Sequence, residues 1–331
     1  MRAVRLHAFG PAENLVYEET DTPEPGPGQV RIAVAACGVH LLDTSLRAGD
    51  AGGSPVPLPE LPTVPGREVA GTVDALGEGT DPRWLGRRVV THLGTAPGGY
   101  AEAAVADAER LHEIPDGLDA DRAVAMIGTG RTALGILGFT ELSADDVVVV
   151  TAAAGGIGSL LVQHARNAGA TVVGLAGGPA KVARVRALGA GIALDYTDGG
   201  WAEQARTALG GRAATVVFDG VGGAAARAAV GLLGEGGLHL VFGWSAGDGP
   251  AGPDPEADAR GIVSRSALGP AMLERFGGGM AGMRQLETLS LAQAAAGAVV
   301  PLVQWFPLHQ AAEAHRALET RGTVGKVVLR P

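Results

Sequence analysis

Gly155 and Gly158 lie in the segment DDVVVVTAAAGGIGSLLVQHARNAGATVVG, which covers residues 145 to 174. With Ala153 they fill the three positions of the pattern G-x-G-x-x-G, with alanine in the first. Glycine at these positions lets a pyrophosphate approach the backbone, and the helix beginning near Ile157 offers free N–H groups and the positive end of its dipole. The segment predicts a dinucleotide site; the alternative is a glycine turn without a ligand.

The charges that follow this segment bear on which dinucleotide is bound. An NAD site needs an acidic residue about 20 positions on, at the end of the second strand, to hold the ribose hydroxyls. Between Ser159 and Leu194 there is no Asp or Glu, and the charged residues are cationic: Arg166, Lys181, Arg184 and Arg186. We therefore expect NADP(H), whose phosphate these cations attract, unless they form only a solvated helix face.

The elements that must position such a site fall into two regions. Before residue 120 the apolar runs are short and broken by Pro and Gly, which predicts a small barrel or sandwich with strands at 30–36, 68–76, 87–93 and 100–106. After residue 121, strands alternate with helices, which predicts a parallel sheet covered by helices. We expect strands at 145–150, 170–176, 214–222 and 237–243 and helices at 157–168, 180–188 and 224–233.

Two segments have the composition of loops. Residues 49–66 carry five prolines and no periodicity, and loops of this length are often functional. Residues 247–258, GDGPAGPDPEAD, are predicted to form a flexible linker.

Length and charge exclude several classes of protein. The 331 residues suffice for about two domains, and the net charge of −9 disfavours binding to a phosphate backbone. The N-terminus shows no signal peptide, and the longest uncharged run, Thr288 to Leu308, is interrupted by Gln and Pro. We expect a cytoplasmic protein that neither spans a membrane nor binds nucleic acid.

Several runs together resemble the zinc-independent quinone oxidoreductase (zeta-crystallin-like) branch of the medium-chain dehydrogenase/reductase superfamily. They are ACGVHLLDTSLRAG at 36–49, PGREVAGTV at 65–73, AAAGGIGS at 152–159, DYTD at 195–198, VVFDGVGG at 216–223 and GKVVL from Gly325, in the order the family has them. The resemblance implies an α/β fold in which a GroES-like β-rich catalytic domain, made from residues 1–121 and 257–331, is joined to a Rossmann doubly wound parallel-sheet domain at 122–256. It also implies a homodimer.

The resemblance assigns residues to NADPH. Thr132 matches a threonine near the nicotinamide, and Phe242 and Gly243 match the strand end beside that ring. The remaining matches are the pyrophosphate turn at Gly155, Gly156 and Ile157, the 2′-phosphate contacts Lys181 and Tyr196 with the neighbouring Gly177, and Lys326, a C-terminal lysine near the cofactor. For Phe242 and Tyr196 the alternative is core packing.

Zinc-dependent relatives hold a catalytic metal at positions that read His40, Arg67 and Thr129 in this chain. Arginine and threonine are not ligands of an N/S zinc site, and Cys37 is the only cysteine. We therefore expect no metal. Without a Lewis acid the chemistry favours substrates that accept hydride readily, namely quinones and enones.

The catalytic candidates are His40, Asp43 and Ser45. The reduced substrate needs a donor for its developing oxyanion, which His40 can supply, although it could instead contact a neighbour or the ribose and leave protonation to water. The family commonly has Asn and Tyr at positions 40 and 45, so Ser45 either enlarges the pocket or removes a proton donor. We interpret Asp43 and Glu68 also as structural carboxylates, with Glu68 paired to Arg67 or another cation.

Three functions remain open from the sequence. The first is an NADPH-dependent quinone or enone reductase acting on a small molecule. The second is an enoyl reductase for a larger or carrier-bound intermediate, which the absence of the tyrosine mildly favours. The third is a non-catalytic NADPH-binding or RNA-binding protein, and the net charge of −9 argues against RNA.

Overall fold

The computed structural model describes residues 1–50, 56–95, 97–245 and 255–331. The chain divides into two compact units. The first unit comprises Met1–Thr129, Glu287–Gly297 and Pro301–Pro331, and the second comprises Gly130–Leu286 and Ala298–Val300. These bounds differ from the predicted divisions at residues 121 and 256, because the chain that follows residue 256 continues the sheet of the second unit.

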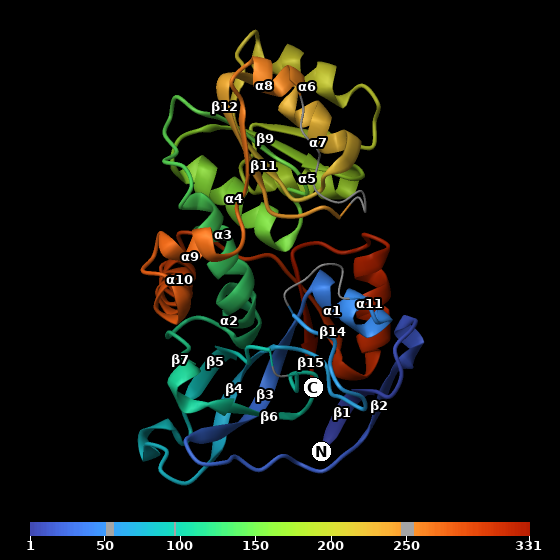
Figure 1. The fold of residues 1–331 in the computed structure, drawn as a ribbon, viewed down its shortest axis with the longest axis vertical. Coiled ribbons are helices and arrows are strands. Elements are labelled where there is room, and N and C mark those ends of the chain that lie inside the picture. The colour runs from blue at the N-terminus through green and yellow to red at the C-terminus, as the bar shows by residue number, and fades with distance from the viewer. Residues whose placement is uncertain (51–55, 96, 246–254) are drawn as a thin grey trace. The chain divides into compact units, whose positions relative to one another are not determined.

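A seven-stranded sheet is the centre of the first unit (Figure 1). Its order is β14-β15-β3-β4-β5-β7, and β6 pairs with β3. The strands are β3 (Gln29–Val39), β4 (Glu68–Leu76), β5 (Arg88–His92), β6 (Ala103–Asp107), β7 (His112–Glu113), β14 (Val303–Pro307) and β15 (Lys326–Arg330). β1 (Arg2–Leu6) and β2 (Leu15–Glu19) form a separate antiparallel pair. Both ends of the chain therefore contribute to this unit.

β3 shows why the first sheet forms. Val30, Ile32 and Val34 alternate with more exposed residues, so one face of the strand enters the core. β3 extends beyond the predicted 30–36 to Val39, because Cys37 and Val39 pair with β15. The helices of this unit are α1 (Leu41–Ala48), α2 (Ala120–Ala125) and α11 (Ala311–Glu319), and a π-helical turn, Met126–Gly130, follows α2.

Six parallel strands form the sheet of the second unit, in the order β10-β9-β8-β11-β12-β13. This order confirms the predicted doubly wound sheet, since the chain starts at central β8 and adds strands first on one side and then on the other. The strands are β8 (Val147–Val150), β9 (Thr171–Ala176), β10 (Ile192–Asp195), β11 (Ala214–Asp219), β12 (Leu233–Val241) and β13 (Val263–Ser266). The helices are α3 (Arg131–Leu137), α4 (Gly156–Asn167), α5 (Pro179–Ala187), α6 (Trp201–Leu209), α7 (Gly223–Val230), α8 (Pro255–Ala259) and α9 (Pro270–Glu274); α10 (Gly279–Ala295) crosses the division between the units.

Several predicted bounds differ from the structure. The helix predicted at 224–233 ends at Val230, because Leu233 already pairs with Ala214 of β11. Of the predicted loop at 49–66, residues 51–55 lie outside the described residues, as do residues 247–254 of the predicted linker. The end of that linker is helical, since α8 begins at Pro255.

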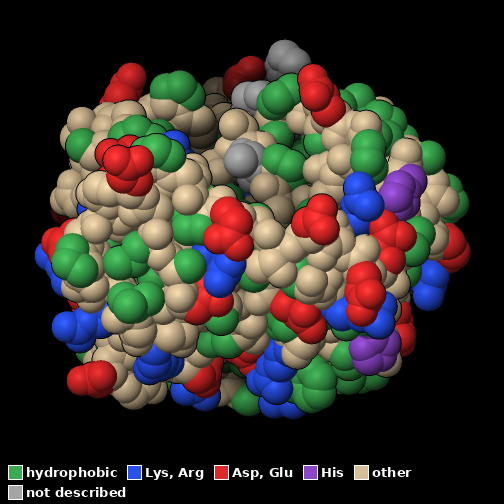
Figure 2. All heavy atoms as spheres, turned by 90° about the horizontal axis from the view of Figure 1, so that it is seen from below, with side chains coloured by type: hydrophobic (Ala, Val, Ile, Leu, Met, Phe, Trp, Pro, Cys, Tyr) green, Lys and Arg blue, Asp and Glu red, His purple; other side chains and the backbone are tan. Residues whose placement is uncertain are grey.

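No helix among the described residues is long and apolar enough to cross a membrane. On the face shown in Figure 2, Asp and Glu side chains are interspersed with Lys and Arg. The described residues of that face therefore present no broad basic surface to a phosphate backbone.

Candidate active site

The predicted nucleotide-binding residues of the second unit, apart from Thr132, follow the carboxyl ends of its strands. Gly155 and Gly156 come after β8, Gly177 after β9, Tyr196 after β10, and Phe242 with Gly243 after β12. The ends of parallel strands meet at one edge of a sheet, where open α/β sheets bind their ligands. Thr132 lies half-buried on α3.

The turn between β8 and α4 is closely packed. Ala152 adopts a positive φ of 45°, and a Cβ on Gly158 would lie 2.3 Å from the Ala152 carbonyl oxygen. Only glycine fits there. Gly155 is the residue before α4, and the first N–H groups of a helix have no acceptor within it. A pyrophosphate accepts such hydrogen bonds, so this turn fits a dinucleotide.

The end of β9 is the place where an adenosine ribose is recognised in this type of sheet. β9 ends at Ala176 without an acidic residue, and Lys181 lies in the first turn of α5. A Cβ on Gly177 would lie 3.5 Å from the Tyr196 hydroxyl, so that hydroxyl covers the glycine. The arrangement fits a ribose that carries a phosphate.

Asp195, one residue beyond the range searched for acids, lies beside this region on β10. Its carboxylate accepts hydrogen bonds from the Gly178 N–H at 3.0 Å, the Thr197 N–H at 2.9 Å and the Thr197 hydroxyl at 2.6 Å. The Thr197 hydroxyl, followed by the two N–H groups, lowers the pKa of Asp195. The Asp195 carboxylate therefore stabilises the turn after β9 through these hydrogen bonds. Spacing from the glycine turn does not reveal this carboxylate, because Asp195 belongs to the third strand of the sheet along the chain.

Phe242 and Gly243 pack against the end of the neighbouring strand. The Phe242 N–H donates to the Asp219 carbonyl at 2.8 Å, and a Cβ on Gly220 would lie 2.6 Å from the Phe242 ring. Phe242 is half-buried and packs against Gly220, which is the alternative role given for it above. Its contact with the nicotinamide remains a prediction.

In the first unit, Glu68 is fully buried between two basic side chains. Lys326 Nζ lies 2.8 Å from Oε2 and His40 Nε2 lies 2.8 Å from Oε1, while the two basic nitrogens are 3.0 Å apart. Burial by itself would raise the pKa of Glu68, but the charges of His40 and Lys326 outweigh it and hold that pKa well below its ordinary value. Cβ atoms on Gly38 and Gly128 would come within 2.2 Å and 1.7 Å of the carboxylate, so both glycines are needed to admit it.

A second buried network surrounds Asp43. Its Oδ2 accepts hydrogen bonds from the His40 N–H at 2.8 Å and the Tyr100 hydroxyl at 3.1 Å, and Arg67 Nη2 lies 3.5 Å from Oδ1. The Tyr100 hydroxyl also lies 3.2 Å from Nε2 of His315. Burial, and then the Asp43 charge, raise the pKa of Tyr100 well above its ordinary value.

The three predicted catalytic residues therefore do not form one site. His40 belongs to the Glu68–Lys326 cluster, and Asp43 fixes the backbone of His40 and the side chains of Tyr100 and Arg67. Ser45 is half-buried on α1 and is not among the residues that line the pocket beside Asp43. Glu68 pairs with Lys326 and His40 rather than with Arg67.

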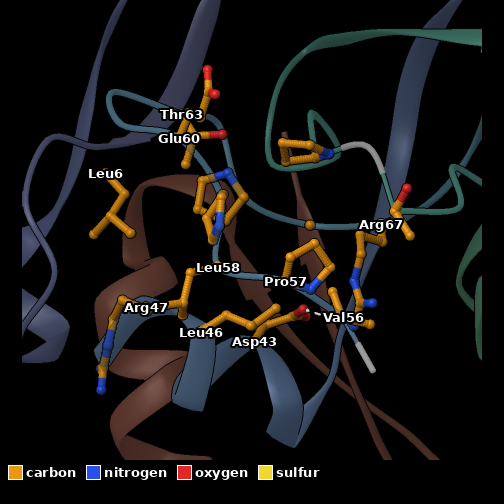
Figure 3. Close-up of a pocket in the computed structure, with 15 residues that line it drawn as sticks. Leu6, Asp43, Leu46, Arg47, Val56, Pro57, Leu58, Glu60, Thr63 and Arg67 are labelled. Carbon is orange, nitrogen blue, oxygen red and sulfur yellow. Dashed lines mark ion pairs between the residues drawn. The ribbon is translucent and has the colours of Figure 1, made fainter. Parts of the chain in front are cut away.

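A pocket of about 230 Å³ opens in the first unit beside Asp43 (Figure 3). Its walls come from α1, from the chain between α1 and β4, from the end of β1 and from the segment after β5. Its lining residues include Asp43, Leu46, Pro57, Leu58, Glu60 and Arg67.

Comparison with known families matches both units. Residues 26–116 match the family described as "Alcohol dehydrogenase GroES-like domain", and residues 156–269 match "Zinc-binding dehydrogenase". The second match begins at the first residue of α4 and covers most of the parallel sheet.

Individual proteins are similar over almost the whole chain. A 2-haloacrylate reductase from Burkholderia sp. is 33% identical over 99% of this chain and 98% of its own length. A solved structure titled as an NAD-dependent alcohol dehydrogenase has a TM-score of 0.86 at 30% identity, covering both chains completely. The Escherichia coli quinone oxidoreductase in complex with NADPH has a TM-score of 0.85 at 26% identity, again over both complete chains.

Proposed function

The chain belongs to the quinone oxidoreductase branch of the medium-chain dehydrogenase/reductase superfamily, and from this we propose that it is an NADPH-dependent, zinc-independent reductase of quinones or α,β-unsaturated carbonyl compounds. The observation that carries the proposal is the Glu68–Lys326–His40 cluster: His40, which stands at one of the zinc-ligand positions, has its Nε2 in contact with a buried ion pair.

The residues of the second unit fit NADPH. The Gly155–Gly158 turn and the start of α4 would hold the pyrophosphate, and Lys181 with Tyr196 would hold the 2′-phosphate. The NADPH complex of the Escherichia coli relative supports this assignment. When bound, NADPH supplies a hydride for the substrate.

The first unit would handle the charge and the proton that this reduction requires. As an enone carbon or a quinone accepts hydride, negative charge develops on the substrate oxygen. Of the three members of the cluster, His40 has 26% of its side chain exposed, against 5% for Lys326 and none for Glu68. His40 is therefore the member that a substrate can reach, and we assign it the hydrogen bond to that oxygen. Glu68 and Lys326 position its ring.

The side chains at the positions of the zinc ligands support a reaction without zinc. His40 contacts the Glu68–Lys326 pair, and Arg67 contacts Asp43. Thr129, the third of these residues, is not a ligand of an N/S zinc site, and the guanidinium of Arg67 would repel a divalent cation.

The proposal is tested by following the oxidation of NADPH and of NADH with benzoquinone, phenanthrenequinone and cyclohexenone, with and without a chelator. We expect turnover that resists the chelator and prefers NADPH. Turnover abolished by the chelator and restored by zinc would refute the zinc-independent mechanism. Tight NADPH binding without turnover of any of these acceptors would favour a larger, carrier-bound substrate or a non-catalytic role.

We also propose that the protein is a homodimer. β13 is the edge strand of the second sheet, and all four of its residues are exposed. An exposed edge offers unpaired backbone groups to a second copy of the chain. Light scattering coupled to size exclusion should give twice the chain mass, and a monomer at all concentrations would contradict the assignment.

A further inference from the structure

Arg67 is a buried cation on the wall of an otherwise largely apolar pocket. Its side chain is only 10% exposed, and in Figure 3 it extends from the chain just before β4 past Pro57 toward Asp43. Among the described residues its Nε has no hydrogen-bond partner. A buried guanidinium N–H without an acceptor costs free energy, and an anionic ligand would remove that cost.

Asp43 does not consume the hydrogen-bonding capacity of Arg67. Its carboxylate already accepts hydrogen bonds from the His40 N–H at 2.8 Å and the Tyr100 hydroxyl at 3.1 Å. The contact to Arg67 Nη2 is longer, at 3.5 Å. Asp43 therefore holds Arg67 through Nη2, while the Nε–H of Arg67 is left to donate to a second carboxylate.

Arg47 also lines the pocket and also has unpartnered nitrogens, but its guanidinium serves another contact. It pairs with Glu319 of α11, and in Figure 3 it points away from the pocket. Arg67 is thus the cation available to a molecule inside.

We propose that this pocket binds the carboxylate of an α,β-unsaturated carboxylic substrate through Arg67, with the carbon chain against Leu46, Pro57 and Leu58. The inference rests on the proposed reductase function and narrows its substrate class. A relative named for an acrylate, which is itself an unsaturated carboxylate, agrees with it.

The test compares acetylacrylate, an enone with a carboxylate, with its neutral methyl ester in the wild-type, Arg67→Met and Arg67→Lys proteins. Wild type should prefer acetylacrylate. Arg67→Met should lower kcat/KM for acetylacrylate by roughly ten- to a hundredfold, the effect of losing one charge-assisted hydrogen bond. The neutral ester has no carboxylate to pair with Arg67, so its kcat/KM should change by less than about threefold. Arg67→Lys should retain part of the preference and keeps the cation beside Asp43 if Arg67→Met folds poorly.

Two further measurements separate the possible outcomes. Glu60→Gln removes an exposed negative charge from the same pocket and should raise kcat/KM for acetylacrylate, with the gain falling as salt rises. Levulinate, the saturated analogue, should bind wild type by calorimetry and bind Arg67→Met more weakly.

Equal losses for both substrates in Arg67→Met, or no preference in wild type, would overturn the carboxylate site while leaving the reductase proposal intact. Failure of every quinone and enone with NADPH would instead overturn the reductase proposal, and levulinate binding would still decide for or against the Arg67 site.

Discussion

Lys326, the first residue of the last strand, places its ammonium 2.8 Å from the carboxylate of Glu68, the first residue of β4. Both side chains are almost completely removed from water. Two charges buried in this way depend on each other, because either one alone would have lost its hydration without compensation.

Lys326→Met should therefore destabilise the protein by about 3 kcal/mol, the cost of leaving a buried charge with an incomplete set of partners. The double variant Glu68→Gln/Lys326→Met removes both charges and should regain most of this loss. Urea unfolding of the wild type and of both variants measures the difference. A double variant less stable than Lys326→Met would contradict the pairing.

Gly158→Ala and Gly155→Ala should differ sharply, although both add one methyl group to the same turn. A Cβ on Gly158 would lie 2.3 Å from the Ala152 carbonyl oxygen, whereas a Cβ on Gly155 would lie 3.2 Å from it. Gly158→Ala must displace backbone and should lower thermal stability and NADPH affinity. Gly155→Ala should fold normally and affect chiefly affinity. Thermal unfolding with and without NADPH checks this, and equal melting temperatures would refute the steric argument.

Lys181→Ala should raise KM for NADPH about tenfold and leave KM for NADH nearly unchanged, because only NADPH carries the phosphate that the lysine would bind. Arg206→Ala is the control, since Arg206 is an exposed cation on α6 that pairs with Glu203. Steady-state kinetics with both coenzymes give the comparison. Equal effects on both would remove the assignment of Lys181 to the 2′-phosphate.

Acidification should destabilise the protein through His315. Burial lowers the pKa of His315 to about 4 from its ordinary 6.5, so the native state stays neutral where the unfolded state takes up a proton. The free energy of unfolding should fall between these two pH values by about 1.4 kcal/mol per pH unit for this group. His164, whose pKa burial also lowers to about 4, contributes in the same window.

His315→Gln should remove the part of this slope that belongs to His315, because glutamine does not titrate. Urea unfolding at several pH values between 4 and 6.5 would show it. An unchanged slope would show that His315 already carries a proton in the native state.

The nucleotide-binding unit could be predicted from the sequence largely because its signals are local. Apolar runs such as Val147–Val150 and the glycines after them determine both strand and turn within a few residues. β10 could not be predicted, because its four residues, between glycines and a polar turn, are too few to show a hydrophobic pattern. β13 pairs with β12 but has no buried face, so its sequence does not alternate between apolar and polar residues.

The charge partners in the first unit could not be predicted, for a different reason. Arg67 and Glu68 are adjacent in sequence, yet successive side chains near a strand point to opposite faces. Glu68 therefore meets Lys326 on one side while Arg67 meets Asp43 on the other. Such pairings depend on how distant strands assemble, which spacing along the chain does not encode.

The position of β15 between β14 and β3 has a consequence for biosynthesis. The sheet of the first unit cannot join its two parts until residues 326–330 have left the ribosome, and until then Glu68 lacks its ammonium partner. The second unit consists of one nearly continuous stretch and can mature earlier during translation. In the nascent chain the nucleotide-binding unit can therefore be complete before the unit that would receive the substrate.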